Sequence, residues 1–391
     1  MNLIYIMGVW EMKKKKVVSF ITMATLLFSA LIIPSQKVQA SSSILNEYQQ
    51  QNICEAIQVQ LIETYGDSYI FENFTYDIED EKIVDGERLV DINVYVDMTL
   101  TKSASENAYV QGMIAKINEL EGIEKSFAEN EVKHLIMDIE EAYNNPRNVQ
   151  VLYTAKLEDS KIKNAQGFEL FSRIDSVDEG ESLLTSVDSI KRSKMKDTEN
   201  AFNNGLKAFD DMITQISLIN MPRASVQYDR IVARDWARDN RSATPEYSKA
   251  NGYGSDCANF VSRAINKGGI PQDISGKWAH HSNGSTIGAY KYINWFRTGA
   301  NNNGGVAPYM VSKGYFYEES SWKKAFAGSI IYNTNTGDSH VGLVTAGDGA
   351  NVYYADHSDV KKSGRETLLQ TSGDPSFKTF KFYLPSSSIL K

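Results

Sequence analysis

The chain carries at residues 254–269 the stretch GSDCANFVSRAINKGG, and the rest of the sequence is best interpreted outward from it. Apolar residues recur at helical spacing after Cys257, which predicts a helix with one buried face. Ser255 or Asp256 is expected to cap its start by accepting bonds from free backbone N–H groups. Gly268-Gly269 is a typical helix end. Cys257 therefore stands in the first turn, where the helix dipole favours a thiolate.

Three observations weigh against a catalytic Cys257. Free cysteines are among the most buried residue types, so it is equally an ordinary core residue. A cysteine nucleophile also needs a histidine elsewhere in the fold. In addition, Asp256 is an adjacent negative charge, which is expected to raise the thiol pKa unless its carboxylate is occupied by capping.

The first 40 residues have the pattern of a secretory signal peptide. Lys13 to Lys16 form a basic cluster, residues 17–33 are almost entirely apolar, and Val38 and Ala40 stand at the two positions that a signal peptidase reads. We predict cleavage after Ala40. The alternative, a membrane anchor, requires a longer apolar run. No later segment is apolar enough to span a membrane, so we expect a secreted or cell-wall-associated protein.

Charge and cysteine content narrow the function classes. Residues 1–40 contain five lysines and one glutamate, a net charge of +4, so their removal changes the net charge from −8 to −12. This acidity gives no electrostatic reason to bind nucleic acid or an anionic membrane. Only Cys54 and Cys257 are present, too few for a disulfide scaffold. They are able to pair, but Cys54 is expected to be a core residue of a helix. Cysteine-poor export is typical of bacteria.

Residues 41–220 predict a first, smaller α+β unit in which helices cover a curved antiparallel sheet. The patterns favour helices over 44–65, over 105–144 with a break near Gly122, and over 186–218. They favour strands over 69–79, 88–101 and 149–157, with Asp85-Gly86 as a hairpin turn. Its single histidine, His134, is expected on a helix, in a surface or packing role. No nucleophile–base pair is visible, so binding, spacing or auto-regulation is the expected role.

A linker over 219–226 leads into the second unit, residues 221–391. A helix is expected over 227–237, with Tyr228, Ile231, Val232 and Trp236 on its buried face. Strands are expected over 328–332, 340–345, 351–357 and 377–384.

Residues 275–305 are rich in Gly, Asn and Ser but carry four aromatic residues, Trp278, Tyr290, Tyr292 and Trp295. These aromatics fit either a binding rim or packing under a long loop. The adjacent His280 and His281 point in different directions and lack further ligands, so we expect no metal.

His340 opens a strand and Asp356 lies on the partner strand, which supplies a base and an orienting group for a cysteine nucleophile. With a two-residue loop, Asp348-Gly349, His340 lies opposite His357. With a three-residue loop starting at Gly347, it lies opposite Asp356. Turn chemistry leaves both open. A carboxylate stabilises an imidazolium better, which favours Asp356.

The motifs around residues 228–236, 245–247, 256–262, 268–269 and 340–344 resemble an amidase domain family of Gram-positive bacteria, related distantly to the CHAP and NlpC/P60 papain-like hydrolases. The resemblance covers about residues 225–385. It implies a papain-like fold, in which a helix carrying Cys257 packs on an antiparallel sheet carrying His340, with Asp356 as the orienting residue. It also implies a peptide or peptidoglycan-like substrate and no cofactor.

The chain departs from the family pattern at Ala258, Arg263 and Ser329, where the family usually has Thr, Gln and an acidic residue. These departures affect substrate contacts rather than catalytic groups. The Cys257 backbone N–H, with Asn251 or Tyr253, is the expected oxyanion donor. The sequence thus predicts a secreted cysteine amidase or peptidase acting on C–N bonds. Two alternatives are a catalytically silent module that binds glycan or peptide, and an interaction protein whose first unit matters most.

Overall fold

The computed structural model describes residues 45–157, 167–174, 182–216, 226–247, 255–280, 292–297, 304–319, 322–333, 340–357, 365–370 and 380–391. All of them belong to one unit, Ile44–Lys391. The predicted signal peptide, and the predicted linker except residue 226, lie outside the described residues. Among the helices described, none is long and apolar enough to cross a membrane.

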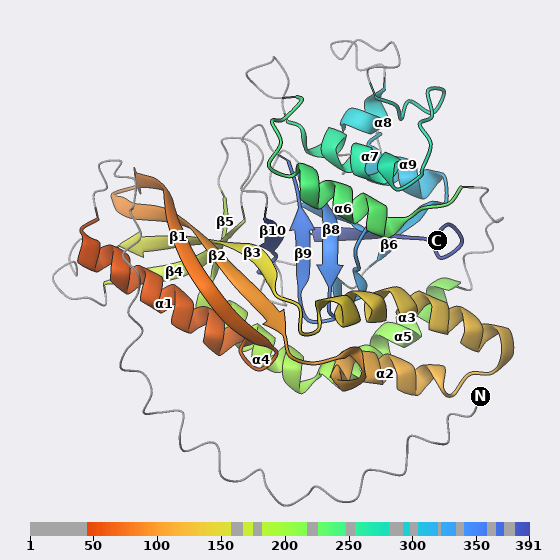
Figure 1. Cartoon of the computed structure of the whole chain (residues 1–391), viewed down its shortest axis with the longest axis horizontal. Coiled ribbons are helices and arrows are strands. Elements are labelled where there is room, and N and C mark those ends of the chain that lie inside the picture. The colour runs from red at the N-terminus through yellow and green to blue at the C-terminus, as the bar shows by residue number, and fades with distance from the viewer. Residues whose placement is uncertain are drawn as a thin grey trace, which may run out of the picture. The chain divides into compact units, whose positions relative to one another are not determined.

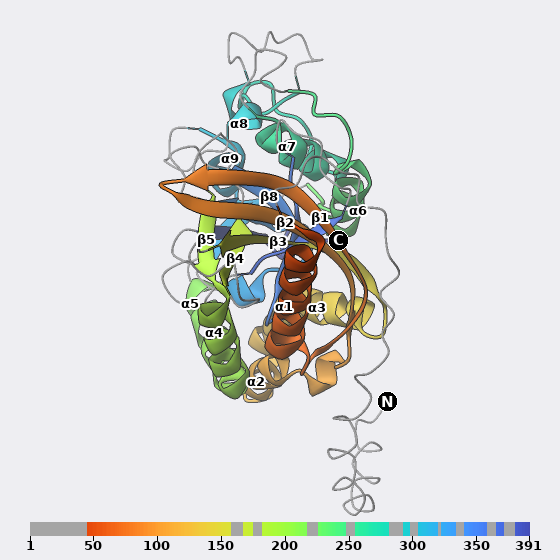
Figure 2. The same ribbon diagram turned by 90° about the vertical axis from the view of Figure 1, so that its left-hand side faces the viewer.

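A long antiparallel hairpin opens the fold (Figure 1). Strands β1 (Tyr69–Val84) and β2 (Glu87–Leu100) pair up to Val84 and Glu87. Asp85 and Gly86 both have positive φ, 52° and 82°, as a type I′ turn requires. The predicted hairpin is confirmed. Two register shifts in β1 bend the ribbon, and helix α1 (Glu47–Tyr65) packs against it (Figure 2).

The remaining elements of the first half follow the predicted pattern with three additions. The predicted helix over 105–144 is α2 (Ala108–Ile117) and α3 (Gly122–Ala142), preceded by a short 3₁₀ turn (Ala104–Glu106), and Gly122 at the break has φ 59°. The predicted helix over 186–218 is likewise two helices, α4 (Val187–Glu199) and α5 (Ala201–Ile216). Beside strand β3 (Arg147–Leu157), β4 (Phe168–Ile174) pairs with β3, and β5 (Leu183–Ser186) pairs with β4. Strands β4 and β5 were not predicted.

The second half contributes the rest of one continuous sheet. Its helices are α6 (Arg230–Asn240), α7 (Cys257–Lys267), α8 (Ile293–Phe296) and α9 (Val306–Ser312), with a 3₁₀ turn at Trp322–Lys324. Its strands are β6 (Phe316–Glu319), β7 (Ile330–Asn333), β8 (His340–Gly347), β9 (Val352–Ala355), β10 (Glu366–Leu368) and β11 (Phe380–Pro385).

The sheet order is β1-β2-β3-β10-β9-β8-β7-β11-β6, with β4 and β5 branching from β3. Only the β10–β3 pair is parallel among the pairs described. The mixed α+β class is confirmed, and the sheet runs across the boundary predicted near residue 220.

Helix α6 buries the predicted face only in part: Tyr228, just before the helix, is buried and Trp236 packs partly buried against the same apolar cluster. Ala233, Ala237 and two arginines, Arg230 and Arg234, are buried, whereas Val232 is 46% exposed. The reason is that the arginines of this face are paired with groups of other elements. The contacts are Arg230 with Asp138 of α3, Arg234 with Glu141 of α3, Arg238 with Glu366 of β10, and the following Arg241 with Gln150 of β3 and Thr367 of β10.

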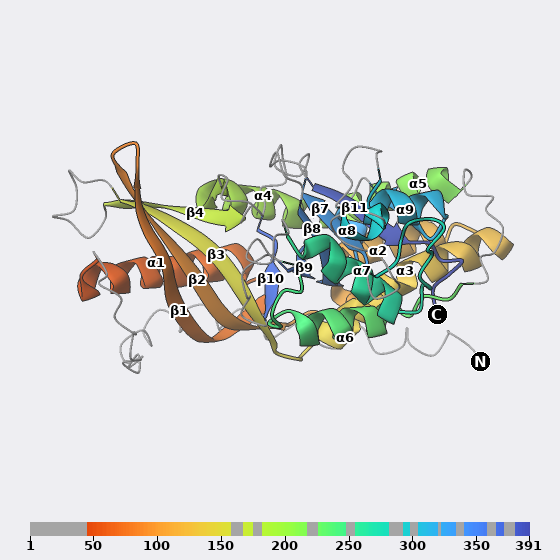
Figure 3. The ribbon, with the colours of Figure 1, turned by 90° about the horizontal axis from the view of Figure 1, so that it is seen from above.

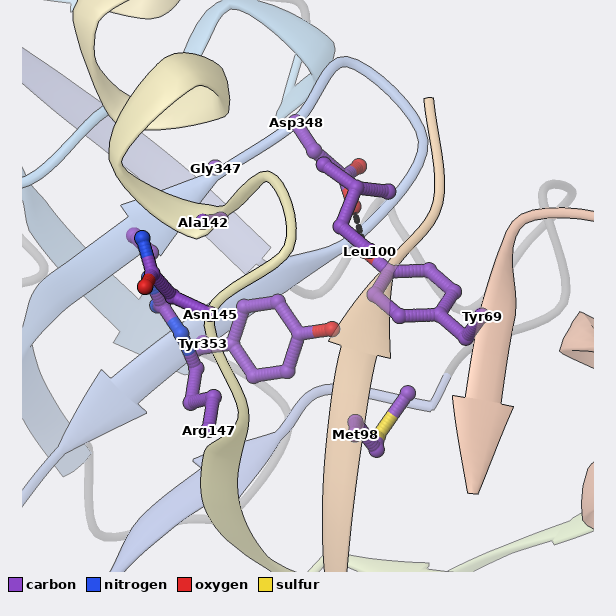
Figure 4. Close-up of a pocket in the computed structure, with 10 residues that line it drawn as sticks. Tyr69, Met98, Leu100, Ala142, Asn145, Arg147, Gly347, Asp348 and Tyr353 are labelled. Atoms are coloured by element: carbon purple, nitrogen blue, oxygen red, sulfur yellow. Dashed lines mark hydrogen bonds between the residues drawn. The ribbon is translucent and has the colours of Figure 1, made fainter. Parts of the chain in front are cut away.

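The turn between β8 and β9 is held by residues of the first half (Figure 4). The Tyr69 hydroxyl donates to the Asp348 carboxylate, and Asn107 Nδ2 donates to the Asp348 carbonyl at 2.8 Å. The same carboxylate accepts the backbone N–H groups of Ala350 (2.7 Å) and Asn351 (2.5 Å). Burial raises the Asp348 pKa to about 6. The hairpin that carries the candidate base is therefore anchored at its tip.

Candidate active site

Helix α7 begins at Cys257, as predicted, and Cys257 is buried. Ser255 Oγ accepts the Cys257 N–H at a long 3.4 Å. Asp256 is the first residue before the helix, but its side chain makes no capping bond. Of the two expected caps, only the Ser255 side chain accepts a backbone N–H at the helix start, so the capping expected of Asp256 does not occur.

Helix α7 packs on β8, and this packing brings His340 to the helix start. Helix α6 lies beside α7 (Figure 3). Val261 and Ile265 of α7 share one apolar cluster with Val341 and Leu343 of β8. His340 is the first residue of β8. Its imidazole interacts with the Cys257 thiol. The buried His340 Nδ1 has no hydrogen-bond partner among the described residues, whereas Nε2 is bonded to Asp356, so Nδ1 is the nitrogen available to the sulfur.

The second nitrogen of His340 is bound to Asp356. The distance between His340 Nε2 and Asp356 Oδ2 is 2.6 Å, and both side chains are buried. The structure thus brings together all three residues singled out from the sequence, in the order thiol, imidazole, carboxylate.

The electrostatics favour the charged forms of this group. Burial raises the pKa of the Cys257 thiol, but the hydrogen bond and charge of His340 outweigh it, so the pKa lies below its usual value. Burial lowers the pKa of His340, but Asp356 and Cys257 outweigh it and raise the pKa to about 9. These directions favour a thiolate beside an imidazolium at neutral pH.

Both predicted loop registers are wrong, although Asp356 does meet His340. Gly347 pairs with Val352, and the Asp348 N–H donates to the Asn351 carbonyl at 3.2 Å, so the loop is Gly349-Ala350. A register shift then falls between Val344 and Ala346. Beyond it Leu343 pairs with Ala355, which places the next residue, Asp356, diagonally from His340.

His357 belongs to a second pair, which sequence reasoning missed. Its Nδ1 is bonded to Asp256 Oδ2, and its Nε2 lies 2.9 Å from the Ala243 carbonyl oxygen. His357 is therefore not the partner of His340. The one sequence signal for this pair was the charge of Asp256 beside Cys257.

A further group around Glu246 was also missed. Glu246 Oε2 accepts from Arg263 Nη1 (2.9 Å) and Asn259 Nδ2 (3.2 Å), and His280 Nε2 lies 3.0 Å from Oε1. Burial raises the Glu246 pKa, but His280 and the other partners outweigh it and lower the pKa to about 2. Arg263, one of the departures from the family pattern, thus donates to the Glu246 carboxylate, and its guanidinium also lies over the Trp236 ring.

The aromatic residues after α7 pack in the core. Trp278, Tyr292 and Trp295 are buried, and the two indole rings lie 4.9 Å apart. The binding-rim interpretation is wrong for these three, and the packing alternative holds. Four other residues of interest, Asn251, Tyr253, His281 and Tyr290, lie outside the described residues. In the described part of the chain, no group of three metal-ligating side chains is present.

A cysteine at a helix start, a histidine at a strand start and a carboxylate bound to that histidine define a candidate nucleophile–base site. Residues 227–380, which contain all three, match the family model described as "Putative amidase domain". The match supports an amidase-like domain here and hydrolysis of amide bonds as its chemistry. No curated protein and no solved structure matches the chain.

The two cysteines, both free thiols, are expected to differ in reactivity. Burial and the nearby Glu55 raise the Cys54 pKa to about 12, whereas that of Cys257 is lowered. At pH 7, iodoacetamide should alkylate Cys257 at least about tenfold faster than Cys54, as measured by peptide mass spectrometry. His340→Ala should slow alkylation of Cys257 and leave Cys54 unchanged. Equal rates at the two sites would contradict this prediction.

Proposed function

We propose that the chain is a cysteine hydrolase that cleaves amide or peptide C–N bonds. One arrangement carries the proposal: buried His340 lies close enough to the Cys257 thiol to lower its pKa, and its Nε2 is bound to Asp356 Oδ2 at 2.6 Å. In this assignment Cys257 is the nucleophile, His340 the general base and acid, and Asp356 the orienting carboxylate. The proposed arrangement, a cysteine helix on a histidine-bearing sheet, is papain-like.

The proposed reaction uses these groups in two steps. The Cys257 thiolate attacks the carbonyl carbon, and the tetrahedral intermediate collapses to a thioester as His340 gives its proton to the leaving amine. Water then attacks the thioester carbonyl while His340 takes the water proton. The C–S bond breaks, which releases the acid and restores the thiolate beside the imidazolium. The Cys257 N–H at the start of α7 is the proposed oxyanion donor, since its bond to Ser255 is long, 3.4 Å.

We propose a peptide or peptidoglycan-like substrate outside the cell. The basic and apolar pattern of residues 1–40 and the predicted cleavage after Ala40 support export. The acidic net charge gives no reason to propose nucleic acid as a partner.

Zymography on purified bacterial cell walls tests the proposal. The wild-type protein should clear the substrate, Cys257→Ala should not, and the matched Cys54→Ala variant should clear as the wild type does. Clearing by Cys257→Ala would rule out the nucleophile. Binding to walls by wild type and Cys257→Ala without clearing by either would favour the silent binding module.

A further inference from the structure

Asp256 and His357 are a buried acid–base pair beside the candidate nucleophile. Asp256 directly precedes Cys257, and the two side chains are almost fully buried, 2% and 3% exposed. They come from different parts of the fold, the residue before α7 and the residue after Asp356 at the end of β9. Their contact joins the start of the cysteine helix to the sheet.

The hydrogen bonds of His357 indicate a protonated ring. Its Nε2 faces the Ala243 carbonyl oxygen at 2.9 Å, and its Nδ1 faces Asp256 Oδ2. A carbonyl only accepts, so Nε2 must carry a hydrogen. A neutral imidazole has one N–H, whereas the imidazolium has two and satisfies both acceptors.

The surroundings of Asp256 indicate its ionised form. Its Oδ1 accepts the Tyr247 N–H at 3.1 Å and Asn259 Nδ2 at 2.9 Å, in addition to the bond from His357 to Oδ2. Three donors around one carboxyl group stabilise the carboxylate. A buried carboxylate beside an imidazolium avoids the cost of an unpaired buried charge.

We propose that Asp256 and His357 form an internal ion pair that neutralises the carboxylate beside Cys257 and so allows the thiolate to form. Both residues are positioning residues, since neither is assigned a contact with substrate. The proposal deepens the proposed function, because it rests on Cys257 being the reactive thiol.

The charges around the thiol agree with this role. His340 lowers the Cys257 pKa, and the Asp256 carboxylate, in the adjacent residue, is turned to the His357 ring. Other groups near the two pairs are Asp356, bound to His340, and Arg241, 3.9 Å from Asp356. The Tyr247 hydroxyl, whose pKa Asp256 raises, and Glu246, joined to Asp256 through Asn259, are also near. The Phe260 ring lies 4.9 Å from the His357 ring centroid.

The adjacent residues Asp356 and His357 therefore make two different contacts at the site. Successive residues of an extended chain point to opposite sides. Asp356 turns to the base His340, while His357 turns to the residue that precedes the nucleophile. The dipeptide after β9 thus binds the imidazole His340 directly and, through Asp256, the backbone that carries Cys257.

The test measures the thiol directly, independently of any substrate. In the full-length Cys54→Ser protein, the rate of iodoacetamide alkylation of Cys257 is followed against pH, which gives the thiol pKa. His357→Gln leaves the carboxylate without its counter-charge, so the thiol pKa should rise by about one unit, with about tenfold slower alkylation below the pKa. The double variant Asp256→Asn/His357→Gln removes both charges, and its alkylation rate should return to within about twofold of the parent.

The outcomes separate charge from structure. A double variant as slow as His357→Gln, or a His357→Gln variant with an unchanged thiol pKa, would overturn the proposal. If His357→Gln fails to fold, the Asp256→Asn variant tests the proposal instead. Removing the carboxylate should not raise the thiol pKa, so a raised thiol pKa in Asp256→Asn would overturn the proposal. Failure of wall hydrolysis with the expected shifts in thiol pKa would refute the proposed function and leave the ion pair standing.

Discussion

Replacing Asp138 by alanine is expected to lower the free energy of unfolding by about 3–5 kcal/mol, because it leaves a buried guanidinium without its partner. Asp138 of α3 and Arg230 of α6 are 2% and 3% exposed, and Asp138 Oδ1 accepts from Arg230 Nη1 at 2.5 Å. Asp138 Oδ2 also accepts the Ala327 N–H at 2.6 Å. The measurement is the free energy of unfolding of the full chain from urea denaturation.

The matched control lies one turn further along the same two helices. Glu141 pairs with Arg234, but its side chain is 44% exposed, so water replaces much of what the pair provides. Glu141→Ala is therefore expected to cost no more than about 1 kcal/mol. Equal losses for Asp138→Ala and Glu141→Ala would mean that burial does not determine how much each ion pair contributes to stability.

The buried pair is part of a contact that no local sequence pattern predicts. Arg230 Nε donates to His134 Nδ1 at 3.1 Å. Burial and the charge of Arg230 lower the His134 pKa to about 4, so the ring stays neutral and accepts this bond at pH 7. His134 was expected only in a surface or packing role on a helix. Its partner lies 96 residues away in the sequence.

Features determined by nearby residues were the ones that sequence patterns predicted well. The turn at Asp85-Gly86, the break at Gly122 and the start of α7 at Cys257 each depend on backbone chemistry within a few residues. The buried face of α6 was predicted only in part, for the opposite reason. Apolar periodicity pointed to Val232, while ion pairs with distant segments bury Arg230 and Arg234.

The β8–β9 register shows the same limit within the candidate site. Glycines at 347 and 349 allowed two loops, but the Asp348 carboxylate accepts the N–H groups of Ala350 and Asn351 and so starts the turn one residue later. The Tyr69 hydroxyl, from the first half of the chain, holds that carboxylate. Short strands such as β10, three residues long, offer too few residues for a periodic pattern.

Replacing Asp356 by alanine is expected to lower kcat for amide hydrolysis by about 10²–10⁴, if Cys257 and His340 act as proposed. The loss has two causes. His340 Nε2 would lose its 2.6 Å partner, so the ring would no longer be fixed with Nδ1 toward the thiol. The imidazolium formed beside the thiolate would also lose its nearest negative charge.

The pH profile distinguishes this role from simple damage to the fold. Burial lowers the His340 pKa, but Asp356, together with Cys257, outweighs it and raises the pKa to about 9. The imidazolium is required with the thiolate, so activity should fall as pH rises through that value. Without Asp356, burial dominates, and the high-pH fall should move to lower pH. Asp356→Asn, which can still accept a bond from Nε2, should keep more activity than Asp356→Ala while showing the same shift.

Asp348→Asn is the matched control, because it changes the other buried carboxylate of the same hairpin. Its partners are Tyr69 and backbone N–H groups at the turn, and none of them belongs to the thiol–imidazole pair. It should leave the pH limits of kcat in place even if stability falls. A profile that moves equally in Asp348→Asn and Asp356→Ala would mean that the hairpin, and not the Asp356 carboxylate, sets the state of His340.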